Sequence, residues 1–215
     1  MAKAGALGEV KRRRLRRGRR LAPEARRGLL LDVAAARLLE QGVLPLPAQE
    51  LADAAKVSKA LVYRYFPEPP DLYNALLARD LGRFAEDGIS AALERNPLEA
   101  AVADAAEAYY RHVAAHGPLA QLILRDRFMR GRVSGSAARL RDRLAGKLAR
   151  RLRRELGLSI REAVAMIGVG LTMPEECGRL AFQGALDVER GALVCRELSL
   201  GVLDVARRRA AEARR

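Results

Sequence analysis

The sequence has no tryptophan, only two cysteines and two histidines, and few aromatic residues among its 215 residues. Cys177 and Cys195 lie far apart and do not show the spacing of metal ligands, so we expect two buried thiols. No apolar run approaches the roughly 20 residues that cross a bilayer, and no hydrophobic segment follows the basic N-terminus as it does in a signal peptide. We therefore expect a cytoplasmic protein without a membrane partner.

The sequence also lacks the motifs of common enzyme sites: a phosphate-binding glycine loop, a nucleophile elbow and a zinc-binding helix motif. His112 and His116 are four residues apart, which places both on one helical face, but no acidic residue or cysteine adjoins them as a further ligand. Glu175 and Glu176 are interpreted as an exposed acidic pair. We expect no catalytic residue, no metal ion and no cofactor, so the protein is not predicted to be an enzyme.

Alanine, leucine, arginine and glutamate are abundant instead, while β-branched residues are sparse. Half of the residues are apolar, which at this length suffices to bury a substantial core. This composition favours an all-α protein, and the apolar periodicity divides the chain into about nine helices.

The net charge of +14 is unevenly distributed, because residues 1–27 hold eleven Lys or Arg residues against Glu9 and Glu24. Residues 1–22 are predicted to be a flexible basic arm that follows DNA phosphates or enters the minor groove. The alternative is a solvated charge run without a specific partner. The arginines of this arm are Arg12, Arg13, Arg14, Arg16, Arg17, Arg19 and Arg20.

Residues 46–66 are typical of two short helices joined by a tight turn. Pro47 and Glu50 suit the first turn of a helix, and the small Ala52 and Ala55 allow a second helix to approach closely. The Ser58 hydroxyl suits the N-cap of the second helix. Its exposed face is polar, cationic and aromatic, as in a helix that enters the DNA major groove; the alternative is an ordinary helical hairpin.

Other local signals place the remaining helices. A helix is expected from Pro23 to Gly42, and a long continuous helix from Pro70 toward Leu93. Asn96 is expected to cap the next helix. Leucines at steps of four lead to Gly157, and Ser159 with Glu162 forms a capping box. Pro174 predicts a kink or break, and Asp187 is expected to cap a last helix over Val188–Arg208.

Residues 30–76 resemble the DNA-binding domain of the TetR (tetracycline-repressor-like) family of transcriptional regulators. The resemblance depends on ordered pieces: Leu30–Ala34, Leu38–Gly42, Glu50–Ala52, Val57–Lys59, Tyr63, Tyr65–Phe66 and Asp71–Leu72. The sequence departs from the family at Pro47, where a threonine is usual, and at Lys56 and Ala60, where glycine is usual. These departures affect which operator is bound.

The resemblance implies a three-helix DNA-binding domain over residues 23–68 and a helical effector-binding and dimerisation domain over residues 69–215. It further implies a homodimer that pairs through its last two helices and a repressor that an unidentified small, lipophilic ligand releases from a palindromic operator in double-stranded DNA. A different hypothesis is a non-specific architectural protein that binds nucleic acid through its arginine-rich arm.

Candidate contact residues follow from these assignments. Those for DNA are Gln49, Lys56, Ser58, Lys59, Leu61, Tyr63, Arg64 and Tyr65. Those for the effector pocket are Tyr73, Leu77, Tyr109, His112, Phe128 and Met129, each of which also fits plain core. Arg125 or Arg127 would suit an anionic head group such as that of an acyl-coenzyme A, or a surface ion pair.

Overall fold

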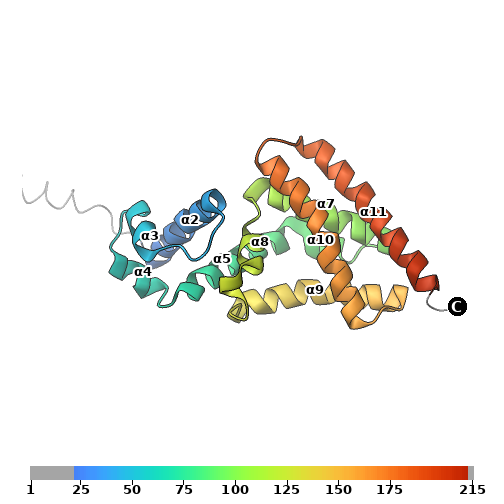
Figure 1. The fold of residues 1–215 in the computed structure, drawn as a ribbon, viewed down its shortest axis with the longest axis horizontal. Helices are drawn as coiled ribbons and strands as arrows, with labels where there is room; N and C mark the ends of the chain where they lie inside the picture. Colours follow the sequence, from blue (N-terminus) through green and yellow to red (C-terminus); the bar gives the residue numbers. More distant parts are fainter. Residues whose placement is uncertain (1–21, 213–215) are drawn as a thin grey trace, which may run out of the picture.

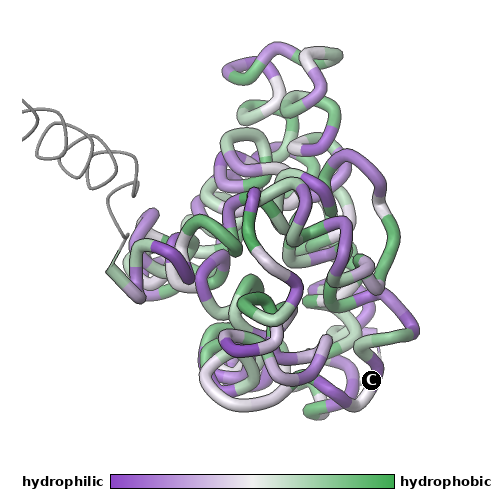
Figure 2. Tube along the Cα trace, turned by 90° about the vertical axis from the view of Figure 1, so that its left-hand side faces the viewer, coloured by the Kyte–Doolittle hydropathy of each residue, from purple (hydrophilic) through white to green (hydrophobic). Residues whose placement is uncertain are grey.

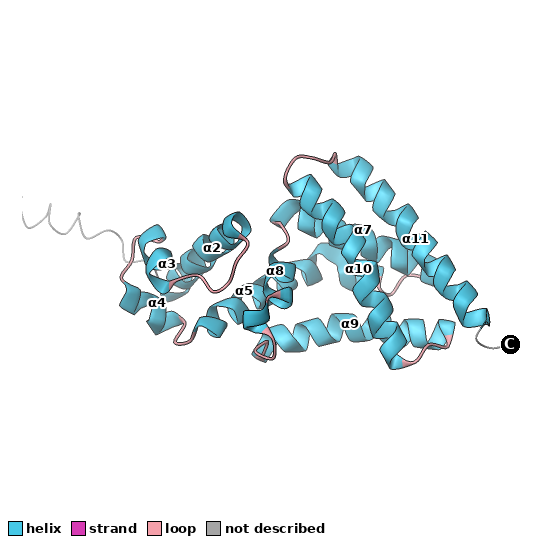
Figure 3. Cartoon of the chain, viewed as in Figure 1, coloured by secondary structure: helices cyan, strands magenta, loops and turns pink. Residues whose placement is uncertain are grey.

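The computed structural model describes residues 22–212, and these residues form helices joined by short loops, without a strand (Figure 3). The predicted basic arm, Arg12 to Arg20, lies outside the described residues. The all-α prediction is confirmed. Within the described part no single helix has the length and apolar character of a membrane span, although α9 and α10 together, bent by 117°, have that composition.

Figure 1 shows α2, α3 and α4 at one end of an elongated molecule, with α5 leading from them into a larger body. We call α2–α4 the head and the part from α5 onward the body. The elements are α2 (Pro23–Gln41), α3 (Ala48–Ala54), α4 (Lys59–Tyr65), α5 (Pro69–Phe84), the π-helical turn η1 (Ala85–Ile89), α6 (Ser90–Ala92), α7 (Leu98–His116), α8 (Leu119–Arg125), the 3-10 turn η2 (Arg127–Met129), α9 (Gly135–Leu156), α10 (Ile160–Phe182) and α11 (Val188–Glu212).

The helix ends predicted from capping residues are mostly confirmed. Gly42 has a left-handed φ of 71°, and its N–H donates to Leu38 O over 2.8 Å. The Ser159 hydroxyl and the Glu162 carboxylate form the expected capping box of α10. Asp187 Oδ1 accepts from the Arg190 N–H over 2.9 Å at the start of α11. Short side chains next to free N–H groups make such ends predictable.

Two predicted features around residues 84–97 are wrong. The continuous helix from Pro70 ends at Phe84, because Gly88 has a φ of 97° inside the π-helical turn η1. Asn96 does not cap α7; Pro97 is at the N-cap, and Asn96 Oδ1 accepts from Arg151 Nη2 over 2.9 Å. A long-range hydrogen bond to α9 has replaced the local one.

Of the kink or break expected near Pro174, the break is wrong, because α10 runs through this residue. A proline inside a helix removes one hydrogen bond and costs about 3 kcal/mol. The Pro174 ring is fully buried, and α10 packs along both α7 and α9. This packing holds the helix together across the missing hydrogen bond.

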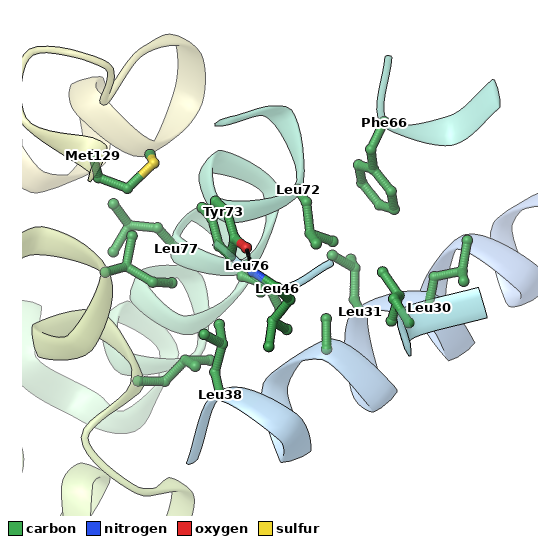
Figure 4. Close-up of a cluster of buried hydrophobic side chains, with 14 of the residues drawn as sticks. Leu30, Leu31, Leu38, Leu46, Phe66, Leu72, Tyr73, Leu76, Leu77 and Met129 are labelled. Atoms are coloured by element: carbon green, nitrogen blue, oxygen red, sulfur yellow. Dashed lines mark hydrogen bonds between the residues drawn. The ribbon is translucent and has the colours of Figure 1, made fainter. Parts of the chain in front are cut away.

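The head and the body share one hydrophobic cluster, which extends from Leu30 and Leu38 in α2 through α5 to Ile123 in α8 (Figure 4). Inside it the Leu46 N–H donates to Tyr73 Oη over 2.6 Å. Figure 2 shows hydrophilic and hydrophobic residues alternating along most helices, as expected for amphipathic helices that cover shared cores. The start of α5 at Pro69 coincides with the predicted domain boundary, but the core is continuous across it.

Candidate DNA-binding surface and effector cavity

The turn between α3 and α4 is fixed by backbone hydrogen bonds. The Val57 N–H donates to Ala52 O over 2.9 Å, and the Lys56 N–H donates to Asp53 O over 3.1 Å. These are the two bonds of a Schellman motif, whose left-handed residue is usually glycine. Here it is Lys56, with a φ of 54°. The motif therefore sets the angle between the helices and places an exposed ammonium group at their corner.

Helix α4 presents a polar face on a buried base. Ser58 Oγ accepts from the Leu61 N–H over 3.3 Å, and Val62 is buried against the head. Lys59, Tyr63 and Arg64 are exposed. Lys59 Nζ lies 5.9 Å from the centre of the Tyr63 ring. Within residues 22–212 neither Lys59 nor Arg64 has an ion pair, so both cations remain available to an anionic partner.

The other predicted DNA contacts surround this face. Gln49 is exposed and its amide donates to Asp53 Oδ1 over 2.8 Å, which holds it at the start of α3. Lys56 and Ser58 are exposed, while Leu61 and Tyr65 are half-buried, and Tyr65 packs against the core. Arg27, which was not among the predicted contacts, places its guanidinium 5.5 Å from the Phe66 ring. No local sequence signal connects α2 to the end of α4 in this way.

The body contains a partly open apolar cavity of about 220 Å³, lined by residues of α5, η1 and α7–α11. Its wall is mostly aliphatic, and the only polar groups among its lining residues are those of Tyr109, Arg141 and Ser199. Ser199 Oγ is buried and has no hydrogen-bond partner in the described part of the chain. Representative lining residues are Leu81, Phe84, Leu144, Leu148, Met166, Ile167 and Leu203. Such a wall suits an apolar ligand with at most a few polar anchors.

The candidate pocket residues divide between this cavity and other places. Tyr109 lines the cavity. Tyr73, Leu77 and Met129 are buried in the cluster that joins head and body, and the Phe128 ring packs edge-on to Tyr73 at 5.8 Å. Sequence reasoning missed the aliphatic residues of α9, α10 and α11, because nothing in their spacing distinguishes a cavity wall from ordinary core.

Polar groups gather beside Tyr109 at one side of the cavity. Gln121 Nε2 donates to Tyr109 Oη, and Arg125 Nη1 lies 2.8 Å from Glu175 Oε1. Burial raises the pKa of Glu175 above its usual range, although Arg125 acts in the opposite direction. Glu175 has a side chain only 12% exposed, so the exposed Glu175–Glu176 pair predicted from the sequence is wrong for the first residue. Arg125 thus forms an ion pair with Glu175, which was the alternative to binding an anionic head group.

His112 is buried between two carboxylates next to the cavity wall. Its Nδ1 lies 2.9 Å from Asp87 Oδ2, and its Nε2 lies 3.4 Å from Asp80 Oδ1. Burial alone would lower the pKa of His112, but hydrogen bonding and the charges of Asp80 and Asp87 raise it. The acidic neighbours that the sequence around His112 lacks are thus supplied by α5 and η1. The His116 ring lies 4.9 Å away.

Comparison with known proteins supports this arrangement of head and body. Residues 30–76 match the family model of the bacterial regulatory proteins, tetR family. The HTH-type transcriptional activator FasR of Mycolicibacterium smegmatis is 37% identical over 92 residues, which are 40% of this chain and 42% of FasR. The match therefore spans about two fifths of the length of that relative.

Solved structures extend the similarity beyond the head. A TetR-like transcriptional regulator from Rhodococcus sp. RHA1 has a TM-score of 0.64 at 21% identity, over 86% of this chain and 99% of that chain. FadR from Bacillus subtilis, in complex with stearoyl-CoA, has a TM-score of 0.61 at 20% identity, over 80% of this chain and 96% of that chain. These relatives are transcriptional regulators and not enzymes. Residues 30–76 thus match the N-terminal domain model of the tetR family, and the chain shares the fold of TetR-like regulators along most of its length.

Proposed function

We propose that the protein is a transcriptional repressor that binds a palindromic DNA operator as a homodimer and leaves it when a lipophilic ligand enters the body. The observation that carries this proposal is the face of α4. Lys59 and Arg64 are exposed and have no ion pair within residues 22–212, on a helix whose angle to α3 is fixed by a Schellman turn. In a helix-turn-helix this face meets the major groove.

The roles of the residues follow from their positions. Lys59 is at the first turn of α4, where residues are nearest to base edges, and Arg64 with Tyr65 lies beside the groove. Lys56, Ser58 and Tyr63 suit phosphate contacts, which position the helix without reading sequence. Leu61 can offer only an apolar contact, such as one to a thymine methyl group.

Dimerisation is supported by an apolar face that α10 and α11 leave uncovered. Val169 is 67% exposed, Leu193 is 63% exposed and Leu198 is 50% exposed. Exposed large apolar side chains gathered on two neighbouring helices are typical of an interaction site. Pairing of these two helices with those of a second copy would place two α4 helices about 34 Å or a multiple of it apart, which requires a near-palindromic operator.

The dimer has a direct test. Wild-type protein should sediment as a dimer, and Leu198→Glu should sediment as a monomer that retains its helical circular-dichroism spectrum. A charged substitution at the exposed Glu197, Glu197→Lys, is the matched control at a position that contributes no apolar surface. A monomeric wild type, or a dimeric Leu198→Glu protein, contradicts the assignment.

The ligand class is inferred from the cavity. Its wall is aliphatic, and its volume of about 220 Å³ is below the roughly 300–1,000 Å³ of sites for drug-sized ligands. A fatty acyl chain would therefore bind a wider state of the body more tightly than the one described, which is how a ligand shifts a conformational equilibrium. The stearoyl-CoA complex of the structurally similar FadR supports an acyl thioester as the first ligand to test.

An activator is the second candidate, because FasR is described as a transcriptional activator. Transcription in vitro from a promoter with the selected operator distinguishes the two: a repressor lowers the transcript level and an acyl ligand restores it. An increase in transcript on adding the protein would contradict repression while leaving operator binding intact.

The experiment that tests the proposal is selection of genomic DNA fragments by the purified full-length chain at physiological salt. A short palindrome should be enriched, and its affinity should exceed that for random DNA by about 10³ or more. Lys59→Ala should weaken operator binding by about 1–3 kcal/mol and relax sequence preference, whereas Tyr63→Phe should weaken binding to all sequences alike. If no motif is enriched and deletion of residues 1–22 abolishes binding, the architectural hypothesis is correct instead.

A further inference from the structure

A cluster of two histidines and two aspartates lies in the body beside the cavity, outside the DNA-binding face. It joins Asp80 of α5, Asp87 of η1, and His112 and His116 of α7. One ligand atom from each of Asp87, His112 and His116 falls within 4.8 Å of the others. These residues come from two segments that are distant in sequence, so the fold has brought them together.

The separation of His112 from Asp87 is close to the one that a shared metal ion imposes on two of its ligands. Two ligand atoms that are each about 2.1 Å from an ion, at angles between octahedral and tetrahedral, lie about 3.0–3.4 Å apart. His112 Nδ1 and Asp87 Oδ2 are already 2.9 Å apart. The His112 and His116 rings, one helical turn apart, have centroids 4.9 Å from each other. The ligand atom of His116 lies within 4.8 Å of the other two and would have to move closer to share one ion with them.

The two ring nitrogens of His112 have different surroundings. The His112 side chain is 3% exposed, yet its Nε2 makes no hydrogen bond within residues 22–212. Coordination of an ion at Nδ1 would place the ring proton on Nε2, where Asp80 Oδ1 is the nearby acceptor at 3.4 Å. Asp87, by contrast, has a side chain 44% exposed, so the cluster is open to solvent on that side.

We infer that Asp87, His112 and His116 bind a divalent transition-metal ion such as Zn²⁺, with His112 coordinating through Nδ1. Two imidazoles and one carboxylate on one face of the ion suit Zn²⁺, Fe²⁺ or Ni²⁺ rather than Ca²⁺ or Mg²⁺, which prefer oxygen ligands. Water would fill the remaining positions on the side of Asp87. This inference does not depend on the proposed regulatory function.

Asp80 acts as a positioning residue in this site. It is 4% exposed, and its Oδ1 lies 3.4 Å from His112 Nε2, on the opposite side of the ring from Asp87. A carboxylate that accepts the other ring N–H of a metal-bound histidine fixes its tautomer and orientation. With the Nε2 proton directed at Asp80, the lone pair of Nδ1 is directed toward Asp87 and the ion.

The site would connect the ion to the rest of the body through two neighbours. The Phe84 ring lies 5.2 Å from the His112 ring and also lines the apolar cavity. Asp87 belongs to η1, the π-helical turn that ends α5, and such turns are frequent at functional sites. Coordination would tie η1 to α7 and so fix one wall of the cavity.

The test uses the untagged full-length protein after removal of metal ions with a chelator. Titration calorimetry with Zn²⁺, together with the visible absorption of added Co²⁺, should show one equivalent bound, and Mg²⁺ should give no signal. His116→Ala and Asp87→Asn should each weaken Zn²⁺ binding at least tenfold. Both side chains are partly exposed, and circular dichroism and thermal unfolding without metal check that the variants fold.

Matched variants separate this site from other causes. Glu86→Gln removes the exposed acidic neighbour of Asp87 and should bind Zn²⁺ as the wild type does, and so should Cys177→Ser, which removes a thiol. Asp80→Asn should weaken binding by about 10–100-fold and alter the Co²⁺ spectrum, and Asp80→Glu should restore part of the affinity. Absence of saturable Zn²⁺ uptake by the wild type, or equal affinity in His116→Ala, would overturn the inference.

Discussion

The head and the body differ in how many buried polar atoms lack a hydrogen bond and in how much apolar surface is left uncovered. In the head, buried residues form a continuous core, and its candidate DNA contacts are at the surface. All four buried side-chain atoms without a hydrogen-bond partner in residues 22–212 belong to the body, on Glu99, His112, Gln121 and Ser199. The body also contains the cavity and the uncovered apolar face. The head is therefore packed for one surface contact, whereas the body has places for further partners.

The two parts are nevertheless joined by specific bonds along α5. Tyr73 Oη accepts from the Leu46 N–H in the loop before α3, and Arg79 pairs with Asp32 of α2 at 2.6 Å. On the body side the Asn74 amide donates to Arg132 O over 3.0 Å and accepts from the Ser134 N–H over 2.9 Å. A shift of α5 relative to α9 would thus be transmitted to the head.

The largest predicted effect comes from truncating one leucine in the head and one in the body. Leu38→Ala should lower the free energy of unfolding by about 3–5 kcal/mol, because Leu38 is fully buried and the truncation leaves a new cavity. Leu124→Ala should cost less than about 1.5 kcal/mol, since Leu124 is 37% exposed and already borders the body cavity. Urea unfolding measures both. Equal losses would contradict the difference in packing between head and body.

Replacing a glycine by alanine in each part should give the next largest change in the free energy of unfolding. In Gly191→Ala the new Cβ would lie 2.7 Å from Tyr110 Cζ, and Tyr110 is held by its hydroxyl, which donates to Val188 O over 2.9 Å. We expect a loss of about 3 kcal/mol in unfolding free energy from this overpacking. Gly28→Ala in α2 meets nothing within 4 Å and should gain up to about 1 kcal/mol through helix propensity. Thermal unfolding of the two variants should shift in opposite directions.

The helices of the head could be predicted from the sequence because the signals that define them are local. Caps such as Ser58 and Gly42 act on N–H and C=O groups one turn away, and the family pattern covers residues 30–76. The exposed cations of α4 follow directly once Val62 is placed inward. The half-burial of Tyr65, by contrast, depends on packing against the rest of the head.

The body was less predictable because its sites depend on contacts between distant segments. Of the six candidate pocket residues only Tyr109 lines the cavity, whose wall combines residues from six helices. Asp87 reaches His112 from a turn whose π geometry depends on Gly88, and Asn96 bonds to Arg151 instead of capping α7. Apolar periodicity identifies the buried face of a helix but not what that face contacts.

Removing the hydroxyl that joins body to head should have an intermediate effect. Tyr73→Phe leaves the buried Leu46 N–H without its 2.6 Å partner, so we expect a loss of about 2 kcal/mol in the free energy of unfolding. Tyr63→Phe, at an exposed tyrosine of α4, should change stability by less than about 0.5 kcal/mol. Urea unfolding distinguishes the two. Equal stability of both variants would show that this hydrogen bond does not hold the head to α5.

The smallest change in stability is expected at Lys56, where the residue that suits a DNA contact is less stable in its backbone conformation than glycine would be. The left-handed φ of 54° costs a side-chain-bearing residue about 1–2 kcal/mol, and glycine avoids this cost but loses about 0.5–1 kcal/mol of backbone entropy. Lys56→Gly should therefore raise the unfolding free energy by less than about 1 kcal/mol while weakening DNA binding and reducing its salt dependence by about one phosphate contact. Lys59→Ala, the matched control on α4, should weaken DNA binding without the gain in stability. If Lys56→Gly binds DNA as tightly as the wild type, Lys56 makes no phosphate contact, and its strained backbone serves only the turn.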